Sequence, residues 1–146
     1  MDRQIKVIQA EVRTPESKAD AIIVNEELFT FKNTGLTRRV FVNEDKTKVV
    51  KVPVTETDYE HNRKEAEMWQ YGDEEFKSEF AESHLLDNGY LMQEYLQTLD
   101  DDETEEVIGR TMTMKEIRFA GKCRNEVGFD KDGNLKCYDY DEYKRW

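Results

Sequence analysis

Three short turns between apolar runs constrain the fold of this 146-residue chain more than any other feature of its sequence. They lie at residues 43–46, at Asp87-Asn88-Gly89 and at residues 130–133. Asn-Gly is among the strongest hairpin signals in a single sequence, and strands joined by so short a turn pair in antiparallel fashion. The expected strand pairs are 36–42 with 48–54, 80–86 with 90–96, and 126–129 with 135–140.

The N-terminal region predicts a strand followed by a helix. Residues 4–12 resemble a strand, and Thr14-Pro15-Glu16 combines a hydroxyl N-cap, a proline whose missing N–H costs nothing there, and an acid. The buried stripe of this helix would consist of Ala19, Ile22, Ile23 and Leu28.

Two more helices are expected, over residues 57–71 and 105–118, with an additional strand over residues 27–31. Hairpins interspersed with helices indicate the α+β class, with an antiparallel sheet of about five or more strands and packed helices. Because no linker or repeat interrupts the chain, we predict a single domain over residues 1–146. Residues 1–27 would form its strand–helix N-terminal extension.

The composition predicts an ordered, acidic domain. The 33 acidic residues outnumber the 22 basic ones, which gives a formal net charge of −11, but seven Phe, seven Tyr and two Trp argue against disorder. No apolar run approaches the ~20 residues that span a bilayer, and no signal-like segment is present. We therefore expect a cytoplasmic protein that binds neither membranes nor nucleic acid directly, since phosphate backbones repel a negative chain.

The negative charge is concentrated in the middle of the chain. Residues 56–107 contain 18 acids and three bases, a net charge of −15, whereas the other residues contain 15 acids and 19 bases, a net charge of +4. The densest run comprises Asp100, Asp101, Asp102, Glu103, Glu105 and Glu106. Two interpretations stay open for it: a solvated start of the following helix, where acids favour the positive end of the dipole, or an acidic surface for a basic partner.

Common catalytic and metal-binding patterns are not found in the sequence. Cys123 and Cys137 have no CxxC spacing, and His61 and His84 belong to no nucleophile–base pattern. The segment that starts at Asp130 does not match a calcium loop, because its sixth position is Leu135 where that loop needs glycine. We read these residues as structural.

One set of charged residues is less ordinary. Lys51 lies within a valine-rich strand, where a buried ammonium group needs an anionic partner. Glu65 follows on the next predicted helix, and Asn125 and Asp139 come near the last hairpin. A lysine paired with a helix glutamate, together with Asn and Asp as metal ligands, is the combination that binds Mg²⁺ and a triphosphate.

With these residues, the sequence resembles the protein-kinase-like superfamily, and more closely the very small kinase-like proteins encoded by bacteriophages. The matching stretches, within residues 28–141, are 33–40, 49–52, 62–69, 91–96, 125–128 and 133–141. The resemblance implies a fold like the smaller kinase lobe with a truncated remnant of the larger one. It also implies that Lys51 and Glu65 contact a nucleotide and that Asn125 and Asp139 hold its Mg²⁺, so that Mg-ATP is the cofactor to test.

The departures from the kinase pattern argue against catalysis. Arg38 and Asn33 replace two of the three loop glycines, and Ala120 stands where the family has its catalytic aspartate. The resemblance therefore implies a non-catalytic protein, with no catalytic residue and no required cofactor. Such a protein would bind a basic host protein through its acidic surface and modulate or inhibit it, counteracting host defence or transcription in the host cytoplasm. The alternative is a minimal Mg-ATP-dependent phosphotransferase.

Overall fold

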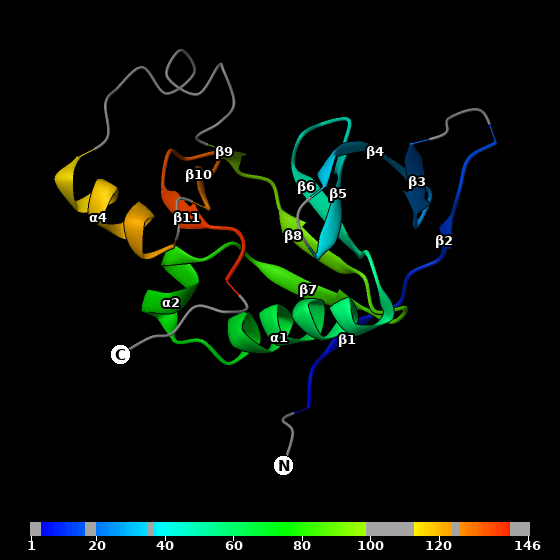
Figure 1. Ribbon diagram of the computed structural model, residues 1–146, viewed down its shortest axis with the longest axis horizontal. Helices are drawn as coiled ribbons and strands as arrows, with labels where there is room; N and C mark the ends of the chain where they lie inside the picture. The colour runs from blue at the N-terminus through cyan, green and yellow to red at the C-terminus, as the bar shows by residue number, and fades with distance from the viewer. Residues whose placement is uncertain (1–3, 17–19, 35–36, 99–112, 124–125, 141–146) are drawn as a thin grey trace.

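The computed structural model describes residues 4–16, 20–34, 37–98, 113–123 and 126–140 of the chain (Figure 1). Its strands are β1 (Val7–Ile8), β2 (Val12–Arg13), β3 (Ala21–Val24), β4 (Glu27–Thr34), β5 (Arg38–Asn43), β6 (Lys48–Pro53), β7 (Ser83–Leu86), β8 (Leu91–Glu94), β9 (Gln97–Thr98), β10 (Val127–Phe129) and β11 (Leu135–Cys137). Its helices are the 3₁₀ turn η1 (Glu56–Asp58), α1 (Tyr59–Gln70), α2 (Glu74–Glu79) and α4 (Met114–Lys122). The predicted α+β class is confirmed.

Eight strands form one large sheet in the order β1-β7-β8-β6-β5-β4-β3-β2. All three predicted hairpins are present, as β5–β6, β7–β8 and β10–β11. The sheet is mixed and not purely antiparallel as expected, because β1 runs parallel to β7. This pair needs no tight turn, since more than 70 residues separate the two strands in the chain.

The large sheet curves back on itself. Its two end strands, β1 and β2, are separated in the chain only by residues 9–11, a span of at most ~14 Å between Ile8 and Val12. Side chains from two distant turns hold this segment: Asp87 Oδ1 accepts from the Ala10 N–H (3.1 Å), and Asn25 Oδ1 accepts from the Glu11 N–H (2.8 Å). The apolar core on the concave side includes Val24, Phe29, Phe41, Val50 and Leu86.

The prediction of a helix that starts at Thr14-Pro15-Glu16 is wrong for residues 21–24, which the structure describes as a strand. Residues 21–24 form strand β3, which pairs with β2 and β4, so the extension over residues 1–27 is not strand–helix. The physical reason is a tight turn at Asn25 and Glu26, both with positive φ, which joins β3 to β4 as a hairpin. Ile22, Ile23 and Val24 are β-branched, and such side chains favour a pleated surface over a helix.

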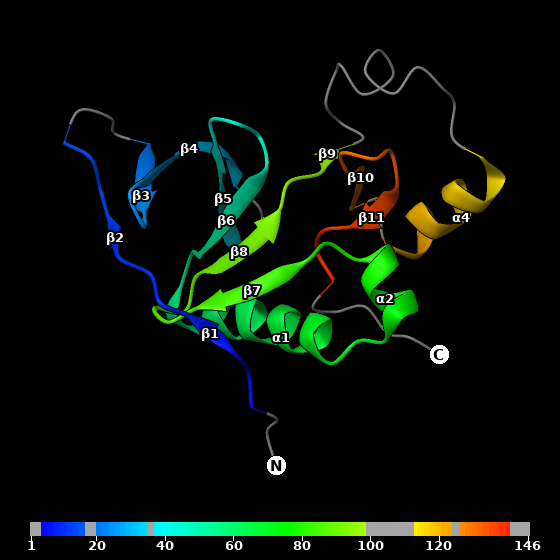
Figure 2. The same cartoon turned by 180° about the vertical axis from the view of Figure 1, so that it is seen from behind.

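A second, smaller part of the molecule packs against the end of the large sheet. Figures 1 and 2 show α2, α4 and the three-stranded sheet β11-β10-β9 gathered on one side, with β2 to β6 on the other. Its apolar core consists of Phe76, Phe80, Ala120, Cys123, Val127, Cys137 and Tyr140. Lys136 links the two parts, because its ammonium group donates to the Glu94 carboxylate of β8 (2.9 Å).

The helices differ in detail from the sequence expectations. The helix expected over 57–71 is confirmed as α1, and α2 was not anticipated, although Asp73 caps it by accepting from the Phe76 N–H (2.8 Å). Of the helix expected over 105–118, residues 105–112 lie outside the described residues, and the described remainder belongs to α4, which follows the Thr113 capping box and continues to Lys122. No helix in the described ranges is long and apolar enough to cross a membrane.

Candidate functional site

Two basic side chains lie on the same face of the large sheet. Lys51 of β6 is in register with Val40 of β5, and Arg38 is two residues before Val40. Because side chains two apart share a face and cross-strand partners lie on the same side, Arg38 and Lys51 both point to that face. Helix α1 packs beside it and supplies Asn62 and Glu65, which are three residues apart and lie one above the other on the helix.

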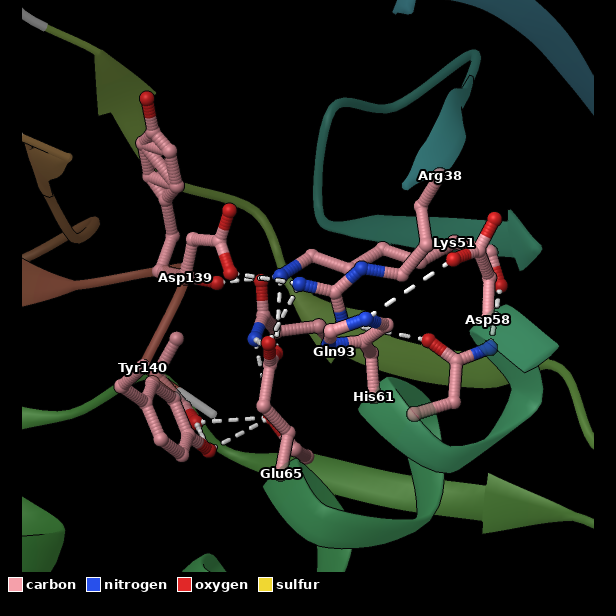
Figure 3. Close-up of polar contacts among 12 residues, drawn as sticks. Arg38, Lys51, Asp58, His61, Glu65, Gln93, Asp139 and Tyr140 are labelled. Atoms are coloured by element: carbon pink, nitrogen blue, oxygen red, sulfur yellow. Dashed lines mark hydrogen bonds and ion pairs between the residues drawn. The ribbon is translucent and has the colours of Figure 1, made fainter. Parts of the chain in front are cut away.

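Both cations bind the same buried carboxylate (Figure 3). Glu65 is completely buried; its Oε1 accepts from Lys51 Nζ at 2.9 Å and its Oε2 accepts from Arg38 Nη2 at 2.5 Å. Gln93 of β8 donates a longer hydrogen bond from Nε2 to Glu65 Oε1 (3.4 Å). Lys51 and Arg38 are themselves almost fully buried, so this carboxylate is their compensating charge inside the fold.

A segment far along the chain completes the cluster. Asp139, which follows β11, accepts from Arg38 Nη2 at 2.5 Å across 101 residues of sequence, and the Tyr138 carbonyl accepts from Lys51 Nζ. Figure 3 shows Asp139 and Glu65 approaching the Arg38 guanidinium from different elements. We call Arg38, Lys51, Glu65 and Asp139 the charged site; its two positive and two negative charges balance.

Neutral polar groups hold the charged site in place. Asn62 accepts from Arg38 Nη1 (3.2 Å) and donates from Nδ2 to the backbone carbonyls of Lys51 (3.0 Å) and Gly89 (3.1 Å). This one amide therefore positions the guanidinium and fixes α1 to β6 and to the β7–β8 turn. Asn62 is fully buried, and its bonds to Arg38 and to the Lys51 carbonyl form away from water.

The residue after Asp139 anchors its strand end to the large sheet. The Tyr140 hydroxyl donates to the Ala81 carbonyl (2.8 Å) and lies 2.7 Å from Ser83 Oγ, which also accepts from Gln93 Nε2 (2.9 Å). Burial raises the pKa of Tyr140 well above its ordinary value, so the hydroxyl keeps its proton for this bond.

Burial acts in the same direction on Glu65. Desolvation raises the pKa of the Glu65 carboxyl above its ordinary value, and the positive charges of Lys51 and Arg38 oppose this shift. Removal of either cation should therefore leave a buried carboxylate that takes up a proton more readily. The charge of Glu65 therefore depends on the presence of both Lys51 and Arg38.

The structure brings together three of the four residues proposed to bind nucleotide. Lys51, Glu65 and Asp139 all belong to the charged site, whereas Asn125 lies outside the described residues. The acidic run at residues 100–106 also lies outside them. Ala120 is described, and it packs in the smaller apolar core on α4.

Sequence reasoning missed the role of Arg38. It was noted only as a replacement for a loop glycine. Its side chain nevertheless donates hydrogen bonds to Asn62, Glu65 and Asp139. The signal that could have found it is register: an arginine two residues from Val40 shares the face of Lys51 once the β5–β6 hairpin is assumed.

Both oxygens of Glu65 accept from cationic side chains, and Asp139 Oδ1 accepts from Arg38, so the guanidinium bridges these two carboxylates. Of the two residues predicted to hold Mg²⁺, Asp139 is bound by Arg38, and Asn125 lies outside the described residues. Within the described residues, no group of three or more His, Cys, Asp or Glu side chains is placed to hold a metal ion. A comparison with models of protein families and one with curated protein sequences find no match for the chain.

Proposed function

We propose that this chain is a kinase-like protein of bacteriophage type that does not transfer phosphate and acts by binding a basic host protein. In protein kinases a lysine on the third strand pairs with a glutamate on the following helix. The aspartate of the Asp-Phe-Gly motif holds Mg²⁺. Here Lys51 lies on β6, which is the third strand when the count starts at β4, where the resemblance begins, and Glu65 lies on the helix that follows. The kinase-lobe interpretation is supported by this order.

The bridging position of Arg38 carries the non-catalytic part of the proposal. Phosphoryl transfer in kinases depends on a metal ion that neutralises charge on the phosphates and is held by the aspartate. In this chain the aspartate equivalent, Asp139, is instead bound by Arg38 at 2.5 Å. Ala120, at the position of the catalytic aspartate, cannot orient a nucleophile either.

The distribution of acidic residues supports the partner-binding part of the proposal. Residues 56–98 already contain twelve acids against three bases, and the described ones that lie exposed are Glu56, Glu60, Asp73, Glu74, Glu75, Glu82 and Asp87. A surface of one sign accelerates encounter with a partner of the opposite sign and suppresses others. The partner is therefore a host protein with a basic surface, such as one that itself binds nucleic acid, and its inhibition would serve against defence or transcription.

An assay of ADP formation separates this proposal from the alternative, a minimal Mg-ATP-dependent phosphotransferase. The wild-type chain is incubated with ATP and Mg²⁺, and ADP release is compared with that of a Lys51→Met variant. We expect no difference between the two. Release of ADP that requires Mg²⁺ and is lost in Lys51→Met would show that the alternative is correct.

Partner binding is tested with two matched charge reversals. One variant changes four acids of the run (Asp100, Asp101, Asp102 and Glu103) to Lys, and the other changes four exposed acids outside residues 56–107 (Glu11, Glu26, Glu44 and Asp45) to Lys. Basic proteins captured from a bacterial lysate by the wild type should be lost in the first variant and kept in the second. Equal capture by both variants would remove the acidic run from the proposal.

A further inference from the structure

Large apolar side chains that stay exposed occur mostly in pairs in the described part of the chain. They are Val7 and Ile8 on β1, Val54 and Tyr59 on either side of η1, Met114 and Ile117 on α4, and Tyr71 after α1. Single exposed apolar residues are normal on a protein surface, so such a pair needs a second feature before it marks an interface. Two of the pairs have one, because they lie among exposed charges, and the charges around them have opposite signs.

Helix α4 carries the pair that lies among positive charges. Its inner side packs into the smaller core through Ala120 and Cys123, whereas Met114 (63% exposed) and Ile117 (49% exposed) lie one turn apart on its outer side. The same helix has three exposed bases that form no ion pair within the described residues: Lys115, Arg118 and Lys122. At about 100° per residue, these bases and the two apolar residues all fall on the half of the helix that faces away from Ala120 and Cys123. We call these five residues the basic face.

The turn η1 and the start of α1 carry the pair that lies among negative charges. Val54 (48% exposed) precedes η1, and Tyr59 (36% exposed) directly follows it. The Tyr59 ring lies against the β7–β8 turn, where a Cβ added at Gly89 would come within 2.5 Å of it. Glu56 and Glu60 are exposed, share one side of this turn with Tyr59, and form no ion pair within the described residues. We call Val54, Glu56, Tyr59 and Glu60 the acidic patch; an aromatic anchor with a charged rim is typical of an interface hot spot.

The basic face and the acidic patch are far apart in one molecule. Figures 1 and 2 show α4 at one end of the long axis and the start of α1 toward the other side. The two surfaces therefore meet only between molecules. We propose that the basic face of one copy binds the acidic patch of a second copy, so that the chain associates with itself head to tail. This proposal goes beyond the proposed function and does not rest on it, because neither surface includes residues 100–106.

Charge favours a second copy in this one orientation. Each copy has a formal net charge of −11, so most orientations of two copies bring like charges together. Among the described helices, α4 is the one with more basic than acidic residues, and its counterpart on the other copy must be acidic. Apolar residues then meet apolar residues, and bases meet acids that have no other ion-pair partner in the described part of the chain.

The two contacting surfaces are different, which determines how the assembly grows. A head-to-tail contact leaves a free basic face at one end and a free acidic patch at the other, so further copies can add until a ring closes. Standard interfaces use about 20–30 residues on each side, so a contact centred on so few residues is weak. The assembly should therefore depend on concentration and continue beyond a dimer.

The experiment is sedimentation velocity of the full chain over a range of concentrations. The buffer contains about 0.15 M NaCl, where the Debye length is about 8 Å, so that distant repulsion is screened and contact pairs persist. One variant reverses the basic face, with Lys115→Glu and Arg118→Glu, and the other reverses the acidic patch, with Glu56→Lys and Glu60→Lys. Their controls change the net charge by the same amount at exposed positions elsewhere: Lys46→Glu with Lys131→Glu, and Glu44→Lys with Asp45→Lys. Circular dichroism confirms that each variant is folded.

We expect the mean mass of the wild type and of both controls to rise with concentration. Each reversal alone should stay at the monomer mass, because like charges then face each other across the contact. An equimolar mixture of the two reversals should associate again, since each surface of one variant meets its opposite charge on the other. A chain with all four substitutions, which has the same net charge as the wild type, should associate with itself.

Three results would overturn the proposal. They are a wild-type mass that does not change with concentration, association that persists in either reversal, and a mixture of the two reversals that stays monomeric while both controls associate. If one reversal does not fold, the other still decides the question when it is compared with its own control. Both reversals leave residues 100–106 unchanged, so a failure here is distinct from a failure of the lysate capture or of the ADP assay.

Discussion

The substitution Arg38→Met tests whether the charged site holds the β5–β6 hairpin to helix α1. Methionine keeps the long apolar stem and removes the guanidinium, so Glu65 loses its bond at 2.5 Å but keeps Lys51 at 2.9 Å. Breaking a buried ion pair by removing one partner costs about 3–5 kcal/mol. Because one cation remains beside Glu65, we expect the lower end, about 3 kcal/mol, or a fall of about 10 °C in melting temperature for a chain of this length.

The pH dependence of this loss follows from the direction of the Glu65 shift. Burial raises the pKa of Glu65, and the charge of Arg38 is one of the two that lower it, so the variant should have a higher Glu65 pKa than the wild type. A folded-state pKa above the unfolded value favours the fold at low pH, and this contribution is lost as the pH rises through the folded-state pKa. The stability deficit of Arg38→Met should therefore be larger at pH 8 than at pH 5.

The assay is urea unfolding at both pH values, with Arg39→Met as the control. Arg39 is partly exposed, and its ion pair with Asp20 is 3.5 Å long, so its loss should cost at most about 1 kcal/mol. If Arg38→Met were no more destabilised than Arg39→Met, the cluster would not hold strand to helix. A deficit that grows toward pH 5 would contradict the reasoning on Glu65.

Four further substitutions test the rest of the fold. A Cβ at Gly128 would lie 2.7 Å from the backbone of β9, so Gly128→Ala should cost about 1–3 kcal/mol in urea unfolding, whereas Gly121→Ala, with nothing within 4 Å, should stabilise helix α4 by up to about 1 kcal/mol. Phe80→Ala should cost about 3–5 kcal/mol in the same assay, because Phe80 is buried in the smaller core. The Asn43 amide donates a hydrogen bond to the Glu27 carboxylate (2.8 Å) and lowers the pKa of Glu27. This contributes stability at neutral pH that is lost as the pH falls through the folded-state pKa of Glu27. The acid side of a curve of stability against pH should therefore be flatter in Asn43→Ala than in the wild type.

The local elements of this fold could be predicted from the sequence because their signals are local. Each of the three hairpins has a polar turn between apolar runs, and the Asn88-Gly89 turn has φ of +93° at Gly89, a conformation that glycine adopts without strain. Helix α1 was expected because Tyr59, Ala66, Met68 and Trp69 supply apolar surface and Gly72 ends the segment. In such cases the residues that decide the structure are within about ten positions of one another.

The N-terminal misassignment has a different physical cause. Thr14-Pro15-Glu16 is a good helix start, but residues 21–24 form strand β3 because β4 offers it a partner and Asn25 and Glu26 make the turn between them. The parallel pair β1–β7 could not be predicted from the sequence either, because its register of Val7 with Leu85 depends on how the whole sheet curves. Tertiary pairing of this kind overrides local propensity and leaves no signal in a short window.

The charged site could be predicted only in part for a related reason. Lys51 was conspicuous because an ammonium group among valines needs a partner, and Glu65 on the following helix was a plausible one. Nothing near Arg38 in the chain indicates that Asp139, 101 residues away, is its neighbour. A contact between such distant residues becomes visible only once the sheet and the last hairpin are placed.

Stability alone does not account for a cluster that buries three charged side chains beside a fourth, partly exposed one. Replacing a buried ion pair by well-packed apolar residues is often neutral or stabilising by 1–4 kcal/mol, so stability alone gives no reason to keep one. Apolar cores that could have been extended lie nearby, around Phe41 and Val50 in the large sheet and around Phe80 and Tyr140 in the smaller part. An apolar substitute would join strand and helix equally well, so that contact alone does not require charges. Asp139 is the member of the charged site that solvent reaches, at 36% exposure.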